Sequence, residues 1–404
     1  MPSHTAARRT GVVAAGFITF LNLYAPQALL PTLSDAFRSD PAHVGVTVTA
    51  TLLAVAIVAP FVGGISDAVG RRWLIVVAAM LLVMPGLAMC WAGSLHALVL
   101  ARFVQGLMLP FVFAVTVAYI GDECRGAEAA RVTSLYAIAS IVAGFAGRFI
   151  AGWVTEYAGW RAAFLVLAVL TLICAVVIMA SLPMEEQFRP TQGWRGSIEG
   201  FVDQFRNAQV MSTCAAGFAM LFSVVGTFTF ITLYLAGPAF RLGPGALGNI
   251  FVIYLVGAAG TPVASRISQR WGRQRTHALA CAVASFGIMV TLLPSLFPGL
   301  GLGAIMIGLG IAVAGLFAEQ VLSLGHIAAT ARQARSTAVG LYVTCFYAGG
   351  AAGSVAPGEL WRAFGWPGPA VVIVLMQAAA AVITWMVWRR FTPMSPETAQ
   401  ETLA

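Results

Sequence analysis

Long apolar runs constrain this chain more than any other feature of its sequence. Successive apolar segments reach about 20 residues, the length that spans the hydrocarbon core of a bilayer. Of the 404 residues, 59% are hydrophobic and 9% are charged, and the mean hydropathy is +0.87. Because lipid offers no partner to backbone polar groups, each span must be helical. We therefore expect an all-α polytopic membrane protein with twelve spans, at 11–33, 43–65, 73–93, 97–120, 132–155, 161–183, 209–235, 246–265, 277–297, 299–323, 336–357 and 368–388.

The distribution of arginine predicts the orientation of these spans. All 23 basic residues are arginine. With both termini in the cytoplasm, 17 of them lie on the cytoplasmic side, four lie outside and two lie within spans. The positive-inside rule favours this topology, so the net charge of +8 is interpreted as a topology signal and not as a nucleic-acid-binding surface. We expect a monomeric multi-pass protein of a bacterial-type inner (plasma) membrane.

Secretion and metal binding find little support in the sequence. The apolar run after Arg8 and Arg9 is too long for a signal peptide and is interpreted as the first span. The six cysteines are scattered and follow no disulfide or metal-ligand spacing. We therefore expect neither a metal site nor a cofactor.

The chain also resembles itself. "GGISDAVGRRW" from Gly63 matches "SRISQRWGRQR" from Ser265, and "SLYAIASIVAGFAGRF" from Ser134 matches "GLYVTCFYAGGAAGSV" from Gly340. The repeat predicts an N-terminal six-helix bundle (1–183), a cytoplasmic linker (184–208) and a C-terminal six-helix bundle with a short tail (209–404). Two such bundles are a transporter design, with a site between them near the middle of the membrane.

These motifs resemble those of the major facilitator superfamily. Its loop between helices 2 and 3 is similar to "GGISDAVGRR", and its helix 4 motif is similar to Arg102, Gln105 and Gly106. "DECRGAEAAR" and the run through the fifth span resemble the drug:proton antiporter branch, and among its members the arabinose-efflux-like inner-membrane permeases. The run departs from the antiporter signature at Gly144, where the branch has proline, and at Arg148, where it has glycine. The resemblance implies alternating access and transport of a small organic molecule coupled to protons.

The loop after the second span is expected to act as a conformational gate. The resemblance implies that Asp67 faces the start of the eleventh helix in the outward-facing state, and we expect Arg71 to pair with Asp122 at the end of the fourth span. The alternative is a solvated loop that only serves topology. The residues expected in this gate are Gly63, Asp67, Gly70, Arg71, Arg72 and Asp122.

Arg102 and Arg148 are the two cations within spans, at similar depths on sequential helices. A charge in hydrocarbon costs a few kcal/mol or more, so both must face the protein interior or a wet cavity. For Arg102 the alternatives are a structural role, bonded to Asn22 or Gln27 of the first span, and a coupling role. For Arg148 we favour a functional role, because the equivalent position in the second half is Ser354.

Glu319 is the one acid well inside a span, on the tenth helix. Because desolvation favours the neutral form of a carboxyl group, such a residue can take and release a proton as a cavity opens to each side. The alternative is a vestibule carboxylate paired with Arg332 or Arg335. Asp35, Glu156 and Glu359, near outer helix ends, are expected to be ordinary surface charges.

The remaining candidates for the substrate and coupling site are polar or aromatic side chains on helices expected to line the cavity. Pro26 and Pro31 are expected to bend the first of these helices. The candidates are Asn22, Tyr24, Gln27, Gln105 and Gln320, with Ser223, Thr227 and Thr229 as further lining residues.

Three functions were weighed against these residues. The first is proton-coupled efflux of a small organic molecule. The second is uptake or facilitated transport of an organic anion bound by Arg102 and Arg148, since arginine matches carboxylate and phosphate geometry. The third, a membrane enzyme, finds no catalytic motif, and a chain without lysine has no ATP-binding Walker motif. We therefore expect a transporter and not an enzyme, with protons and a small molecule as partners.

Overall fold

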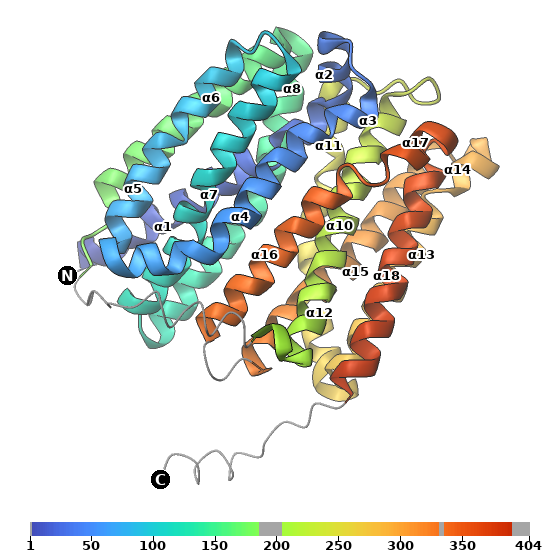
Figure 1. Ribbon diagram of the computed structural model, residues 1–404. Coiled ribbons are helices and arrows are strands. Elements are labelled where there is room, and N and C mark those ends of the chain that lie inside the picture. The colour runs from blue at the N-terminus through green and yellow to red at the C-terminus, as the bar shows by residue number, and fades with distance from the viewer. Residues whose placement is uncertain (1, 186–203, 331–334, 390–404) are drawn as a thin grey trace.

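A computed structural model of the chain describes residues 2–185, 204–330 and 335–389 (Figure 1). Most of the predicted linker, residues 186–203, lies outside the described residues, as do Arg332 and the tail beyond 389. The helices of the first half are α1 (Pro2–Leu23), η1 (Ala25–Leu29), α2 (Leu30–Phe37), α3 (Pro41–Val44), α4 (Val46–Val69), α5 (Arg71–Leu81), α6 (Val83–Cys90), α7 (Leu95–Glu123) and α8 (Gly126–Ser181). Those of the second half are α10 (Ala208–Ala236), α11 (Pro244–Ile250), α12 (Ile253–Trp271), α13 (Arg273–Val290), α14 (Leu293–Leu296), η2 (Pro298–Leu300), α15 (Gly301–Thr330), α16 (Arg335–Gly353), α17 (Gly358–Phe364) and α18 (Pro367–Trp388).

Eleven helices within the described residues are long and apolar enough to cross a membrane. The longest, α8, covers 56 residues and contains the non-helical residue Gly159 (φ 82°, ψ 163°), where the chain turns back. The two arms of α8 match the expected fifth and sixth spans, so all twelve spans are present. The largest differences from the expected limits are at α15, which continues to Thr330, and in the first span, which is not one continuous helix.

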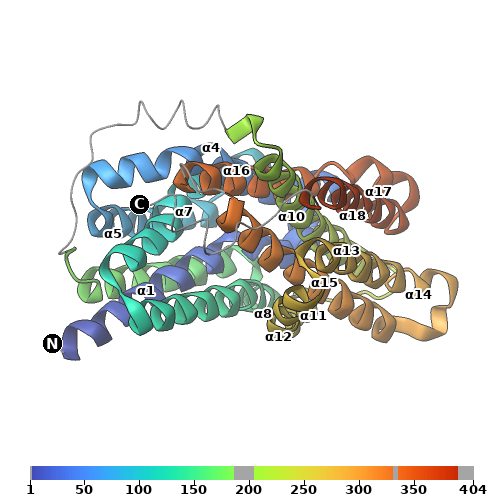
Figure 2. The same ribbon diagram turned by 90° about the horizontal axis from the view of Figure 1, so that it is seen from below.

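The halves form two groups of helices side by side, with α4 and α16 adjacent between them (Figures 1 and 2). Their internal turns repeat: Gly70 (φ 102°) separates α4 from α5, and Gly272 (φ 82°) separates α12 from α13. Only glycine adopts such φ values without strain, which is why both copies of the motif keep it. The 202-residue offset found in the sequence is therefore also an offset between equivalent turns.

The outer surface of the bundles suits lipid. Large apolar side chains remain exposed along the helices, among them Phe61 (55%), Met84 (66%) and Leu375 (63%). A soluble protein rarely exposes so many apolar groups together. The polar residues named as candidates lie on the opposite, inward faces, and they define the site.

Candidate functional site

The first span breaks where two residues of the site are needed. Pro26 has no N–H, so it removes the helical hydrogen bond to the carbonyl of Asn22. The chain ends α1 at Leu23, continues as the short 3₁₀ helix η1 and restarts as α2, where Pro31 occupies the first turn. Segment 22–27 therefore has free backbone groups and a changed direction in the middle of the bundle.

Arg102 of α7 satisfies this break. Its guanidinium donates to the carbonyl oxygens of Asn22 (2.8 Å), Leu23 (2.7 Å) and Thr47 (3.3 Å), and to the side chain of Gln105. The side chain is 1% exposed, and nearly all of its donors are used. This geometry is that of the structural alternative: Arg102 replaces backbone partners that Pro26 has taken away.

Two neighbouring amides complete the network around Arg102. Gln105 donates to the side-chain oxygen of Asn22 (3.0 Å), and Asn22 donates to Thr171 of the second arm of α8 (2.9 Å). The expected hydrogen bond between Arg102 and Asn22 is therefore made through the backbone. Gln27 belongs to a different cation.

Arg148 of α8 lies on the other side of the same break. Its Nε and Nη2 donate to the side-chain oxygen of Gln27 at 2.9 and 2.7 Å, and its Nη1 donates to the carbonyl of Gly144 at 2.5 Å. The side chain is 1% exposed. Because three of its five N–H groups are used here, two stay available to another acceptor.

Three aromatic rings surround this guanidinium. Its central carbon lies 4.6 Å from the ring centroid of Tyr24, 4.5 Å from that of Phe251 and 4.7 Å from that of Tyr254. Such distances give attractive cation–π contacts. Tyr24 belongs to the first half and the other two rings to the second, so the walls of the Arg148 site come from both halves.

The Arg148 site contains hydrogen-bonding groups without a partner. The Gln27 amide nitrogen and the Tyr254 hydroxyl are buried and make no hydrogen bond within the part of the chain that the structure describes. A buried polar group without a partner costs about 1–3 kcal/mol, so such groups mark a place for water or for a ligand. With the two remaining N–H groups of Arg148, the site offers mainly donors.

Glu319 lies apart from Arg148. It is fully buried on α15, and its two oxygens lie 2.8 and 3.1 Å from the amide of Gln377 on α18. The same amide contacts Ser223 of α10 at 2.9 Å. The expected partners Arg332 and Arg335 lie outside the residues whose side chains are described. The carboxyl group therefore points into the second bundle, between α10, α13 and α18, and not toward the interface between halves.

Glu319 also approaches two potential metal-ligating atoms. His277, Cys281 and Glu319 each place one such atom within 4.8 Å of the others. However, the carboxylate is already engaged by Gln377, and the Nδ1 atom of His277 lies 3.2 Å from the hydroxyl of Thr384. Among the residues that the structure describes, three donors converge here, whereas structural zinc sites use four. We interpret the group as a hydrogen-bonded cluster.

The other expected lining residues are less informative. Gln320 is half-buried and lies about 100° around α15 from Glu319. Ser223, Thr227 and Thr229 of α10 are buried, and the hydroxyls of Thr227 and Thr229 have no hydrogen-bond partner. The predicted site thus divides into the network at segment 22–27 and the separate cluster at Glu319.

The expected gate residues gather at one end of the first half, the end that the arginine distribution predicts to be cytoplasmic. Arg71 Nε lies 2.7 Å from Asp122, the expected pair, and Arg71 Nη2 lies 3.3 Å from Asp67. Glu185 accepts hydrogen bonds from the backbone N–H groups of Arg71 (3.0 Å) and Arg72 (3.1 Å) at the start of α5. Gly63 is exposed on α4 with open space beside it. These contacts all stay within the first half.

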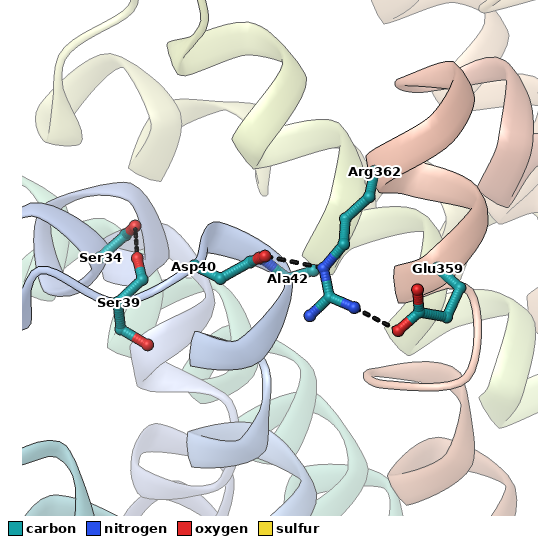
Figure 3. Close-up of polar contacts among 6 residues, drawn as sticks. All are labelled: Ser34, Ser39, Asp40, Ala42, Glu359 and Arg362. Carbon is teal, nitrogen blue, oxygen red and sulfur yellow. Dashed lines mark hydrogen bonds and ion pairs between the residues drawn. The ribbon is translucent and has the colours of Figure 1, made fainter.

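The opposite end, predicted to be the outer one, joins the halves. Asp40, before α3, accepts a hydrogen bond from Arg362 of α17 at 2.7 Å, and Arg362 also pairs with Glu359 (Figure 3). Glu156 of α8 accepts from the backbone N–H of Gly245 in α11 (3.1 Å). Glu156 and Glu359 were expected to be ordinary surface charges. Both are exposed; in addition, Glu156 connects the halves and Glu359 pairs with the arginine that does so.

Comparison with known proteins agrees with this architecture. The sequence profile of the Major Facilitator Superfamily matches residues 12–331. The chain belongs to this family. Its members are transporters and not enzymes, as expected from the sequence, and the protein is a multi-pass membrane transporter.

Relatives of this transporter occur in bacteria. It is 29% identical to the inner membrane transport protein YnfM of Escherichia coli K12, with 93% of this chain and 89% of that protein aligned. It is 25% identical to the MFS-type transporter YybF of Bacillus subtilis 168, over 91% and 90% of the two chains. Its fold is similar to an inward-facing bacterial homologue of the lysosomal transporter Spinster (TM-score 0.78, 14% identity, 98% and 100% covered). The xylose transporter XylE of E. coli is also similar in fold (TM-score 0.74, 13% identity, 95% and 98% covered).

Some residues of the transporter's site were missed by sequence reasoning. Phe251 and Tyr254 are three apart around the junction of α11 and α12, and this spacing places both on one helix face. That signal was present but common to many apolar helices. Gln377 gave a clearer one, since it is a polar residue inside an apolar span of otherwise lipid-compatible composition.

Proposed function

We propose that the protein is a secondary active transporter that exports a small organic molecule in exchange for protons, by alternating access. One observation carries the proposal: the buried cation Arg148 is enclosed by rings from both halves. A site with walls from both halves opens to one side when the halves separate there. Substrate binding and the rearrangement of the halves then act on the same contacts.

The contacts at the two ends support an inward-facing arrangement. Ion pairs and hydrogen bonds at the outer end join the halves, as at Asp40–Arg362 and Glu156–Gly245. The pairs of Arg71 at the cytoplasmic end stay within one half. In the outward-facing state we expect Asp67 to leave Arg71 and face the start of α16. In this proposal the protein lies in a bacterial inner membrane and both termini lie on its cytoplasmic side.

We assign the coupling proton to Glu319. Among the described residues no cation forms an ion pair with Glu319. Its negative charge is therefore neutralised by binding a proton. Glu319→Gln should abolish the dependence of transport on an imposed pH gradient while leaving counterflow of substrate intact. Unchanged pH dependence would assign the proton elsewhere.

A second candidate is uptake or facilitated transport of an organic anion. The unpaired donors around Arg148 favour it, because a carboxylate or phosphate accepts several N–H and O–H bonds at once. Arg102 contributes little to such a site in this geometry, since backbone carbonyls occupy its donors.

One experiment separates the two candidates. Purified protein is screened by thermal shift against panels of anionic, neutral and cationic organic compounds, and the stabilising compounds are tested in proteoliposomes under an inward or outward pH gradient. Accumulation of a compound against its own concentration gradient, in exchange for protons that flow down theirs, supports export. Flux of anions that does not depend on the pH gradient supports the second candidate. If every compound moves only down its own concentration gradient, the export proposal is wrong.

A further inference from the structure

The chain Glu319–Gln377–Ser223 crosses three helices of the second half, α15, α18 and α10. The two ends of the Gln377 amide contact different partners. One end lies 2.8 and 3.1 Å from the two Glu319 oxygens, and the other lies 2.9 Å from the Ser223 hydroxyl oxygen. All three side chains are buried and fully enclosed. An amide carries a donor at one end and an acceptor at the other, so its orientation depends on what the neighbours require.

The two protonation states of Glu319 favour opposite orientations of this amide. A protonated carboxyl donates its O–H to the Gln377 oxygen, which leaves the amide nitrogen to donate to Ser223. An ionised carboxylate only accepts, so it must face the amide nitrogen, and the Gln377 oxygen then faces Ser223 and needs a donor there.

Ser223 has one hydroxyl proton, and a second acceptor competes for it. The hydroxyl donates to the carbonyl of Ala219 on its own helix at 2.8 Å. When Glu319 is protonated, this bond to Ala219 persists, because Ser223 only accepts from Gln377. When Glu319 is ionised, the hydroxyl must turn to the Gln377 oxygen and leave Ala219. A serine bond of this kind to the preceding turn bends a helix slightly, so its loss changes α10 locally.

The affected turn of α10 lies against α16. Gly349 and Gly353 approach the carbonyls of Phe218 and Phe222 so closely that a Cβ atom would not fit. The next residue, Ser354, contacts Thr49 of the first half at 2.6 Å. A change in α10 at Ala219 therefore reaches a contact between the halves through tightly packed backbone.

We infer that Gln377 is a positioning residue that transmits the protonation state of Glu319 to α10, by reversing its amide and redirecting the Ser223 hydroxyl. This inference rests on the proposed function, in which Glu319 takes the coupling proton. It assigns a role to Gln377 and Ser223, which contact neither Arg148 nor the residues of the cytoplasmic gate.

Other titratable groups face Glu319 and belong to the same equilibrium. Cys281 and His277 approach it from α13, and Tyr342 of α16 lies within electrostatic reach. On α12, Tyr254 packs on Phe317 of α15 and belongs to the Arg148 site. With the imidazole of His277 neutral, none of these side chains carries a positive charge at neutral pH. The amide of Gln377 is therefore the main group that stabilises the ionised form of Glu319.

The test is a mutant cycle on the full-length protein in nanodiscs at one pH. Glu319→Gln imitates the neutral acid, and hydrogen–deuterium exchange of the outer segments 38–49 and 354–366 measures how the halves respond. We expect Glu319→Gln to change this exchange by about fivefold or more, the size of an ordinary coupling free energy. In the backgrounds Ser223→Ala and Gln377→Met, the same change should fall below about twofold.

Ser212→Ala is the matched control, because Ser212 is also a buried serine of α10 but bonds Trp388. The effect of Glu319→Gln should persist in that background. If it persists equally in Ser223→Ala and Gln377→Met, the relay is wrong.

Infrared spectroscopy separates the relay from the proposed function. The carboxylic-acid C=O band that Glu319→Gln removes is followed during a pH titration. A band that titrates, together with outer segments that ignore Glu319→Gln in the wild-type background, overturns the relay and leaves Glu319 as the proton carrier. A band that never titrates overturns both.

Discussion

Two crossings between the halves occupy equivalent positions of the internal repeat but differ in chemistry. Ser354 follows Arg148 by 206 residues and Phe251 follows Thr49 by 202, the two offsets of the repeat. At the first crossing the Arg148 guanidinium lies 4.5 Å from the Phe251 ring, and at the second the Ser354 and Thr49 hydroxyls are 2.6 Å apart. The backbones approach closely at both, through a glycine of the facing segment. The architecture therefore requires close backbones at these positions and does not require an arginine.

The helices beside the crossings differ in the same direction. α1 breaks at Tyr24, whereas its counterpart α10 runs unbroken from Ala208 to Ala236. Arg102 secures the break from α7, and the counterpart helix α15 contains no arginine. Among the described residues, the broken helix and the buried cations Arg102 and Arg148 thus belong to the first half, while Glu319, the acid with no exposed surface, belongs to the second. The two halves share a fold and divide the chemistry.

Removing Arg102 should have the largest effect on this comparison. Arg102→Ala leaves the carbonyls of Asn22 and Leu23 without the donors they have here, and each unpaired buried group costs about 1–3 kcal/mol. We expect loss of folded protein or a large fall in the thermal unfolding temperature, measured by intrinsic tryptophan fluorescence. Arg102→Lys should be intermediate, since lysine keeps the charge but cannot reach three carbonyls in one plane. An unchanged unfolding temperature for the alanine variant would contradict the structural role.

Arg148→Ser makes the first crossing resemble the second. Because serine is accommodated at the equivalent position, we expect a folded protein with nearly wild-type thermal stability. Transport should fall at least about tenfold, since a hydrogen bond to a charged group is worth about 1.5–3 kcal/mol. Counterflow in proteoliposomes, with a compound identified by the thermal-shift screen, measures it. Thr49→Val at the second crossing is the control and should retain transport; wild-type transport by Arg148→Ser would remove Arg148 from the site.

Apolar runs, repeated motifs and arginine positions were sufficient for the family, the twelve spans and the Arg71–Asp122 pair. They also identified Arg102 and Arg148 as unusual and favoured a functional role for Arg148, but for Arg102 they left a structural and a coupling role open, because charge and depth are the same for both. The distinction depends on which acceptors each one meets. Pro26 did signal an unpaired carbonyl at Asn22, one turn earlier. For Glu319 the pattern predicted the helix but not the direction of the side chain. Its carboxyl points into the second bundle because Gly315, one turn before it, packs α15 tightly on the backbone of α13.

Substitutions of Gln27 should sharpen the first crossing with a smaller effect. Gln27→Leu removes the oxygen that accepts from two nitrogens of Arg148, so the guanidinium loses its orientation but keeps its charge. We expect a loss of substrate affinity of about three- to tenfold, consistent with one hydrogen bond of roughly 1 kcal/mol. Gln27→Glu places an anion against Arg148. In the thermal-shift screen it should reduce the stabilisation by anionic compounds more than the stabilisation by neutral ones. Equal losses for both classes would contradict an anionic substrate.

Asp40 and Arg362 extend the comparison to a cation in water, where the smallest effect is expected. Partial burial disfavours the Asp40 carboxylate, but hydrogen bonds from Arg362 and from the backbone N–H of Ala42 outweigh it and hold the pKa of Asp40 below its usual value. The contact therefore stabilises outer closure above the ordinary pKa of aspartate, and this contribution is lost as the external pH falls through the lowered pKa. Both side chains are about 40% exposed, with 43% for Arg362 and 40% for Asp40, so water screens the pair. Asp40→Asn should shift the balance between inward- and outward-facing states by less than about fivefold, as for other exposed pairs, and should remove its pH dependence in acid. Hydrogen–deuterium exchange of residues 38–49 measures the shift. A shift in this balance as large as the roughly tenfold change in transport expected for Arg148→Ser would mean that outer closure depends on this one contact and not on the close backbones of the two crossings.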